Sequence, residues 1–265
     1  MPLPRPVAAL AAVPLLCAAL AAPAVADPAP RYAALGDSYA AGVAAGSYDP
    51  ASGDCHRSGR GYPALWAAAH GAALTDAACS AAGADDVRRD QLPKVAADTT
   101  VVTLTVGGND LGFTSAAVDC LQPLTTDARC ERTLDTAAHH LDDDLPGRLD
   151  ALYSAVRAAA PAARVVVTGY PRLLQTGTTC LLATESRRQR FNALTDRLDE
   201  LIRRQSEAHG FAFADVRPVF DGHGTCGGGK EEWINGIVVS HLWESFHPTA
   251  DGQARGYLPT VAALL

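Results

Sequence analysis

Three short motifs, far apart in the chain, carry side chains that could together perform acyl transfer. Ser38 stands in Gly-Asp-Ser-Tyr, at the end of an apolar run, and Asn109 stands in Gly-Gly-Asn-Asp, directly after another. His247 lies near the C-terminus in Ser-Phe-His-Pro-Thr. Acyl transfer needs a nucleophile, a base that deprotonates it, and donors for the oxyanion. A hydroxyl, an imidazole and an amide can fill these three roles.

Each motif has a plainer interpretation when it is taken alone. Gly-Asp-Ser and Gly-Gly-Asn-Asp are typical of tight turns, and a His before Pro is typical of a helix entry. The combination carries more weight, because all three groups occur in one chain at the end of a strand or in a loop. We therefore interpret Ser38, His247 and Asn109 as parts of one catalytic site.

The elements that position these groups can be predicted from the apolar pattern. Short runs near 32–36, 101–106 and 164–168 lack strict alternation and precede a glycine, which is typical of buried parallel strands; 211–216 and 74–78 are further candidates. Helical patterns lie at 62–69, 134–160 and 186–209, and a last helix is expected from Pro248 toward Leu265. Strands and helices alternate, so we expect a three-layer α/β/α sandwich around a parallel sheet of about five strands. Ser38 and Asn109 should meet beyond its C-terminal edge.

The first 26 residues have the pattern of a secretory signal peptide. Arg5 precedes an apolar run, and Ala24-Val25-Ala26 resembles an A-x-A cleavage site. A membrane span is disfavoured because Pro14 and Pro23 interrupt the run and no basic cluster follows. We expect secretion and one domain over residues 27–265.

Composition limits the partners of the mature chain. Without Arg5 it has 21 basic and 29 acidic residues, a formal net charge of −8. Such a surface does not favour nucleic acid or stable membrane insertion, and we expect a monomer that binds a small-molecule or lipid ester. The cysteines are scattered, no C-x-x-C occurs, and no other ligand set is visible. We therefore expect neither a metal nor a cofactor.

Six cysteines remain in the mature chain, and an even number in an exported protein predicts three disulfides. Six cysteines allow 15 pairings, and spacing does not choose among them. The cysteines are Cys55, Cys79, Cys120, Cys130, Cys180 and Cys226.

The motifs together resemble the SGNH (GDSL-type) hydrolase family, and within it the secreted lipases and esterases of streptomycetes. The matching stretches include 32–39, 53–58, 77–80, 107–110, 164–171 and 243–249. The resemblance implies a flavodoxin-like fold and hydrolysis of carboxylic esters through an acyl-enzyme on Ser38. It also implies neighbour-to-neighbour disulfides, Cys55–Cys79, Cys120–Cys130 and Cys180–Cys226. An acetyl esterase acting on polysaccharide and a catalytically silent binding module are the alternatives.

The resemblance also implies the donors of an oxyanion hole. They would be the backbone N–H of Ser38, the side-chain amide of Asn109 and one more backbone N–H. In the family this third donor is typically the glycine of Cys-Ser-Gly, but the matching position here is Ala81. Ala81 is our first candidate, and Gly83 is the second.

The group that orients His247 is a further departure from the family pattern. The usual Asp three residues before the His is replaced by Glu244, which is one methylene longer. Some of the related streptomycete enzymes use a backbone carbonyl two residues before the His, which here belongs to Ser245. We favour the Ser245 carbonyl, with weaker electrostatic support from Glu244.

Overall fold

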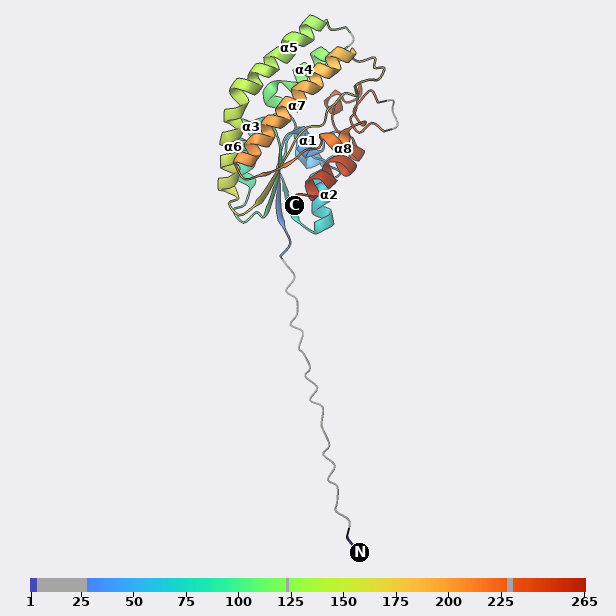
Figure 1. Cartoon of the computed structure of the whole chain (residues 1–265). Coiled ribbons are helices and arrows are strands. Elements are labelled where there is room, and N and C mark those ends of the chain that lie inside the picture. Colours follow the sequence, from blue (N-terminus) through green and yellow to red (C-terminus); the bar gives the residue numbers. More distant parts are fainter. Residues whose placement is uncertain (4–27, 123, 228–230) are drawn as a thin grey trace.

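A five-stranded parallel sheet forms the centre of the computed structural model, which describes residues 1–3, 28–122, 124–227 and 231–265 (Figure 1). The order of the strands is β2-β1-β3-β4-β5. Every strand falls within or beside a run predicted from the sequence, so the expected fold is confirmed. The strands are β1 (Arg31–Gly36), β2 (Ala73–Asp76), β3 (Val101–Thr105), β4 (Arg164–Thr168) and β5 (Ala212–Ala214).

Helices cover both faces of this sheet (Figure 1). One face carries α3 (Ala84–Asp86), α4 (Phe113–Cys120), α5 (Asp127–His139), α6 (Leu145–Ala159) and α7 (Glu185–Ala208). The other carries α1 (Ser38–Ala41), α2 (Tyr62–His70), α8 (Arg217–Phe220) and α9 (Leu258–Ala262). Short 3₁₀ and π turns join several of these elements, among them the π turn His140–Asp144 between α5 and α6.

The core fixes strand β1 from both faces of the sheet. Ala33 and Leu35 belong to the main hydrophobic core, whereas Tyr32 and Ala34 point into a smaller cluster with Trp66 of α2. This alternation follows from the two-residue period of a strand. Because both sets are buried, the register of β1 is fixed, and so is the point where it ends.

The end of β1 requires a glycine. Gly36 has a φ of 125°, and a Cβ at this position would lie only 2.0 Å from the carbonyl oxygen of Thr105 on β3. No residue with a side chain fits this close approach. The next residue, Asp37, donates its N–H to the same Thr105 oxygen at 2.9 Å. The turn that carries Ser38 is therefore attached directly to the neighbouring strand.

Three disulfides cross-link the loops around the sheet. They join Cys55 to Cys79, Cys120 to Cys130, and Cys180 to Cys226. This is the pairing that the family resemblance implies. Two of the three bonds brace segments close to the predicted catalytic groups: Cys79 lies two residues before Ala81, and Cys120 ends helix α4.

The predicted signal peptide, residues 1–26, lies outside the described part of the chain apart from residues 1–3. Among the residues that are described, no helix has the length and apolar character needed to cross a bilayer.

Candidate active site

Ser38 is the first residue of α1, a single helical turn that begins directly after β1. Asp37 caps this turn, because its Oδ1 accepts a hydrogen bond from the N–H of Tyr39 at 2.9 Å. The N–H of Ser38 has no acceptor among the described residues. It is one of the unpaired donors that every helix start presents. The hydroxyl and a free N–H of the same residue are therefore available at the C-terminal edge of the sheet.

His247 lies in a loop that is tied to the Ser38 turn. The N–H of Asn235 donates to the His247 carbonyl at 3.0 Å, and Ile234 pairs with Pro248 in an isolated β-bridge. The hydroxyl of Tyr39 donates to the carbonyl of Phe246 at 2.8 Å. Because Tyr39 follows Ser38 directly, this hydrogen bond helps to hold the two predicted catalytic segments together. The sequence motif includes Tyr39 but gave no reason to assign it this role.

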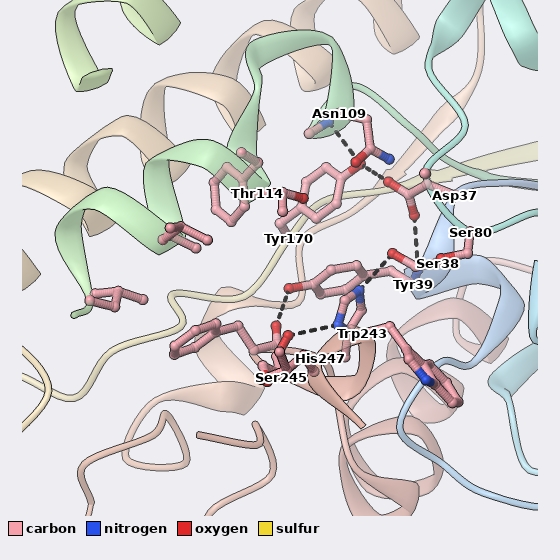
Figure 2. A pocket seen from close by; sticks show the side chains of 18 of the residues that line it. Asp37, Ser38, Tyr39, Ser80, Asn109, Thr114, Tyr170, Trp243, Ser245 and His247 are labelled. Carbon is pink, nitrogen blue, oxygen red and sulfur yellow. Dashed lines mark hydrogen bonds between the residues drawn. The ribbon is translucent and has the colours of Figure 1, made fainter. Parts of the chain in front are cut away.

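Ser38 and His247 are in direct contact (Figure 2). The Nε2 atom of His247 lies 2.7 Å from the Oγ of Ser38, and its Nδ1 lies 2.9 Å from the carbonyl oxygen of Ser245. A carbonyl only accepts hydrogen bonds, so Nδ1 carries the proton and Nε2 offers a lone pair to the hydroxyl. This tautomer is the one that general-base catalysis requires.

Glu244 does not contact this imidazole. Its Oε1 accepts a hydrogen bond of 2.5 Å from the hydroxyl of Tyr48, which in turn accepts one from the N–H of Ala44 at 2.9 Å. No hydrogen bond joins Glu244 to His247 in the described part of the chain. Glu244 therefore anchors the histidine loop, which we define as residues 234–248 between the bridge partners Ile234 and Pro248, to the loop that contains Tyr48. No motif marks Tyr48, and the sequence analysis missed it.

The candidate oxyanion donors lie around the same cavity. One amide hydrogen of Asn109 is donated to the Ala82 carbonyl at 3.0 Å, which leaves the other for a ligand. Ala81 also lines the cavity, and its N–H has no acceptor among the described residues. The N–H of Gly83, by contrast, donates to Asp86 at 2.9 Å. The geometry thus favours Ala81 over Gly83 as the third donor.

Ala81 occupies a backbone conformation that favours glycine, with a φ of 65°. An L-residue pays roughly 1–2 kcal/mol in this left-handed region, and glycine avoids this penalty but loses more entropy on folding. We therefore expect Ala81→Gly to raise the free energy of unfolding by about 0.5–1 kcal/mol and to leave kcat unchanged, because the N–H remains.

The neighbouring Ala82 is the matched control for this substitution. It is buried and does not have a positive φ, so Ala82→Gly should lower the free energy of unfolding. Urea unfolding of both variants measures the difference. Destabilisation by Ala81→Gly, or a tenfold fall in its kcat, would contradict the assignment of this backbone position.

A buried hydrogen-bond network links the Ser38 turn to the Asn109 turn. The hydroxyl of Tyr170 donates to Oδ2 of Asp37 and accepts from the N–H of Gly108 at 3.1 Å. Burial raises the pKa of Asp37 to about 7, against the lowering effect of the hydrogen bonds from Tyr170 and Tyr39. These contacts show that Asp37 holds the geometry of the loop that carries Ser38. Tyr170 was not singled out from the sequence, because nothing near it marks a contact with residue 37.

A cavity of about 370 Å³ opens above Ser38 and His247 (Figure 2). Polar groups are concentrated at the catalytic end, and α4 and the histidine loop form largely apolar walls. Such a cavity is suited to the acyl chain of an ester. The apolar residues of these two walls are Phe113, Ala117, Val118, Leu121, Ile237, Leu242, Trp243 and Phe246.

The pKa of His247 leads to a prediction about pH. Burial lowers this pKa to about 4, and the hydrogen bond to the Ser245 carbonyl opposes the shift. Neutral imidazole is the active base, so kcat/KM should stay constant well below pH 6.5 and fall only when His247 becomes protonated. Between pH 6.5 and 4 the unfolded chain takes up this proton and the native state does not, so stability should decline as pH falls.

NMR titration of the His247 ring shows whether the fall of kcat/KM at low pH comes from protonation of His247. The His247 signal is identified by its absence from His247→Ala, and circular dichroism at each pH checks that the fold persists. A His247 pKa of 6.5 or higher would contradict the prediction, whatever the pKa of Asp37.

The class of protein follows from this geometry. A serine hydroxyl in contact with a histidine imidazole, beyond the C-terminal edge of a parallel α/β sheet, is the arrangement of a serine hydrolase.

Comparison with known proteins agrees with this class. The sequence profile of the GDSL-like lipase/acylhydrolase family matches residues 34–255. Lipase 1 of Streptomyces coelicolor is 44% identical over 242 residues, 91% of this chain and 88% of that protein. Two crystal structures are similar with a TM-score of 0.85: the extracellular lipase of Streptomyces rimosus (41% identity) and phospholipase A1 of Streptomyces albidoflavus (43% identity). The match covers 89% and 90% of this chain, respectively, and 100% of each crystallised chain. The chain belongs to the GDSL-like lipase/acylhydrolase family and is a carboxylic ester hydrolase.

Proposed function

We propose that the protein is a secreted lipid esterase in which Ser38 is the nucleophile and His247 is the base. The observation that carries the proposal is the 2.7 Å contact between Ser38 Oγ and His247 Nε2, in an imidazole whose Nδ1 is engaged by Ser245. This arrangement fixes the tautomer without a carboxylate.

The reaction proceeds in two halves. The Oγ of Ser38 attacks the ester carbonyl while its proton passes to Nε2 of His247. The N–H groups of Ser38 and Ala81 and the free amide hydrogen of Asn109 stabilise the resulting oxyanion. The intermediate collapses, the C–O bond to the alcohol breaks, and His247 protonates the leaving oxygen. Water then attacks the acyl-enzyme by the same route, which releases the carboxylic acid and restores Ser38.

The Ser245 carbonyl limits how well the imidazolium is stabilised. A carbonyl dipole accepts the Nδ1 proton as a carboxylate does, but it carries no full charge. The Glu244 carboxylate faces Tyr48 instead of the imidazole, so it acts on the ring only across a longer distance. We assign to Glu244 the positioning of the histidine loop.

The cavity walls support a lipid acyl chain as the substrate group. They are mostly apolar, and proteins of similar sequence are named lipase and phospholipase A1. Secretion is supported by the pattern of residues 1–26, by the three disulfides, and by the extracellular origin of the lipase from Streptomyces rimosus. We propose that residues 27–265 act as one monomeric domain.

A panel of esters tests this substrate class. We expect kcat/KM for nitrophenyl esters to rise from acetate toward medium-length acyl chains, because each methylene buried in the cavity contributes about 0.8 kcal/mol. Triacylglycerol or phosphatidylcholine should also be cleaved. Fast deacetylation of acetylated xylan, without hydrolysis of longer acyl esters, would instead identify a polysaccharide acetyl esterase.

A further inference from the structure

We propose that three uncharged loops around the cavity mouth form a docking face for the surface of aggregated neutral or zwitterionic lipid. The proposal rests on the function proposed above and adds how the enzyme reaches its substrate. We call this surface the mouth face; it consists of the described residues of three loops, 120–122 with 124–126, 173–184 and 233–243, together with Val118 near the end of α4.

The mouth face is depleted of charge. None of its three loops contains Asp, Glu, Lys or Arg, although such residues make up 19% of the chain. Charged residues stand directly before and after each loop: Asp119 and Asp127, Arg172 and Glu185, and Glu232 and Glu244. The uncharged character therefore stops where the loops return to the body of the protein.

Large apolar side chains project from the same surface. Leu124, Leu181 and Val239 are 97%, 89% and 85% exposed, respectively. Val118, Ile237 and Leu242 are also exposed, and these six are the only large exposed apolar side chains among the described residues from 28 onward. Exposed apolar residues that gather on one surface usually mark a site of interaction.

The first and third loops contribute residues to the cavity wall, and all three loops lie at the end of the molecule away from the start of β1 (Figure 1). Val118 and Leu121 line the cavity from the side of α4, and Ile237 and Leu242 line it from the side of the histidine loop. The second loop joins both neighbours. Arg187, just beyond it, donates to the Thr125 carbonyl at 2.5 Å, and Leu182 Cδ1 lies 3.9 Å from where a Cβ on Gly236 would be.

The chemistry of this surface favours a lipid aggregate as its occupant. An apolar rim continuous with an apolar cavity lets an acyl chain pass from the lipid phase to Ser38 without crossing water. A protein partner on the same face would close the mouth against substrate. Because the mature chain has a formal charge of −8, neutral or zwitterionic lipid is favoured over anionic lipid.

Vesicle binding tests this proposal without interference from catalysis. Ser38→Ala protein should co-sediment with phosphatidylcholine vesicles, and Leu124→Asp, Leu181→Asp and Val239→Asp, combined in the same background, should lower the partition coefficient at least about tenfold. None of these three residues lines the cavity. Ala97→Asp is the matched control, because Ala97 is exposed in the turn before β3 at the opposite edge of the sheet. It should bind vesicles within about twofold of the parent.

Activity measurements on protein that retains Ser38 separate docking from chemistry. With Leu124→Asp, Leu181→Asp and Val239→Asp combined (the triple variant), the enzyme should cleave a soluble nitrophenyl ester at the rate of the unsubstituted protein. It should lose most of its activity on phosphatidylcholine vesicles. Parent-like vesicle binding by the triple variant would overturn the docking proposal and leave ester hydrolysis intact. So would sedimentation velocity showing that the parent forms a dimer through this face and the triple variant does not. If the unsubstituted protein does not hydrolyse the soluble ester, the proposed function itself is refuted.

Discussion

Replacing Ser38 by Ala should lower kcat for ester hydrolysis by on the order of 10⁵- to 10⁶-fold, because it removes the hydroxyl that His247 activates. The variant should fold normally. Among the described residues, the Ser38 hydroxyl is hydrogen-bonded only to His247, and the capping of α1 depends on Asp37. Steady-state kinetics with a nitrophenyl ester, together with a thermal unfolding curve, measures both expectations.

Ser80→Ala is the matched control for this loss. Ser80 also lines the cavity, but its hydroxyl makes no hydrogen bond within the described residues. We expect Ser80→Ala to keep kcat within a few-fold of the parent value. Near-parent turnover by a folded Ser38→Ala protein would rule out Ser38 as the nucleophile.

Substitution of His247 should have a far larger effect than substitution of Glu244. His247→Ala removes the base, so kcat should fall by several orders of magnitude. Glu244→Ala should retain kcat to within about tenfold, because the Ser245 carbonyl still holds Nδ1; removing a true triad carboxylate costs on the order of 10⁴-fold.

Tyr48→Phe provides an independent check on the role of Glu244. It breaks the hydrogen bond to Glu244 from the other side and keeps the carboxylate. If Glu244 positions the histidine loop through Tyr48, the two variants should show similar, modest losses of kcat. A 10⁴-fold loss in Glu244→Ala alone, with its fold intact, would make Glu244 the third member of a triad.

The fold could be predicted where apolar pattern and burial agree. Strands β1, β3 and β4 are almost wholly buried, so their sequences are mostly apolar runs that lead into a glycine. The start of helix α5 was predicted incorrectly. The structure begins it at Asp127, whereas the apolar pattern indicated a start near Leu134. Its first turn carries only one buried apolar residue, Cys130, and is set by Thr126, whose side chain accepts from the N–H of Arg129.

The site could be predicted only in part, for a related reason. Ser38, Asn109 and His247 stand next to strand ends or in short motifs, where sequence neighbours reveal the local geometry. The contact between Tyr48 and Glu244 joins residues 196 positions apart, and it depends on how two loops pack. The φ of Ala81 is likewise set by tertiary structure, since alanine itself does not favour a positive φ.

Labelling with a fluorophosphonate tests the nucleophile most directly. Attack by the Oγ of Ser38 displaces fluoride and leaves one phosphonate group per chain, which peptide mass spectrometry locates. We expect the label on the peptide that contains Ser38, no label in Ser38→Ala, and very slow labelling in His247→Ala. Protein that hydrolyses esters while Ser38 remains unlabelled, or that carries the label on another residue, would contradict a mechanism through Ser38.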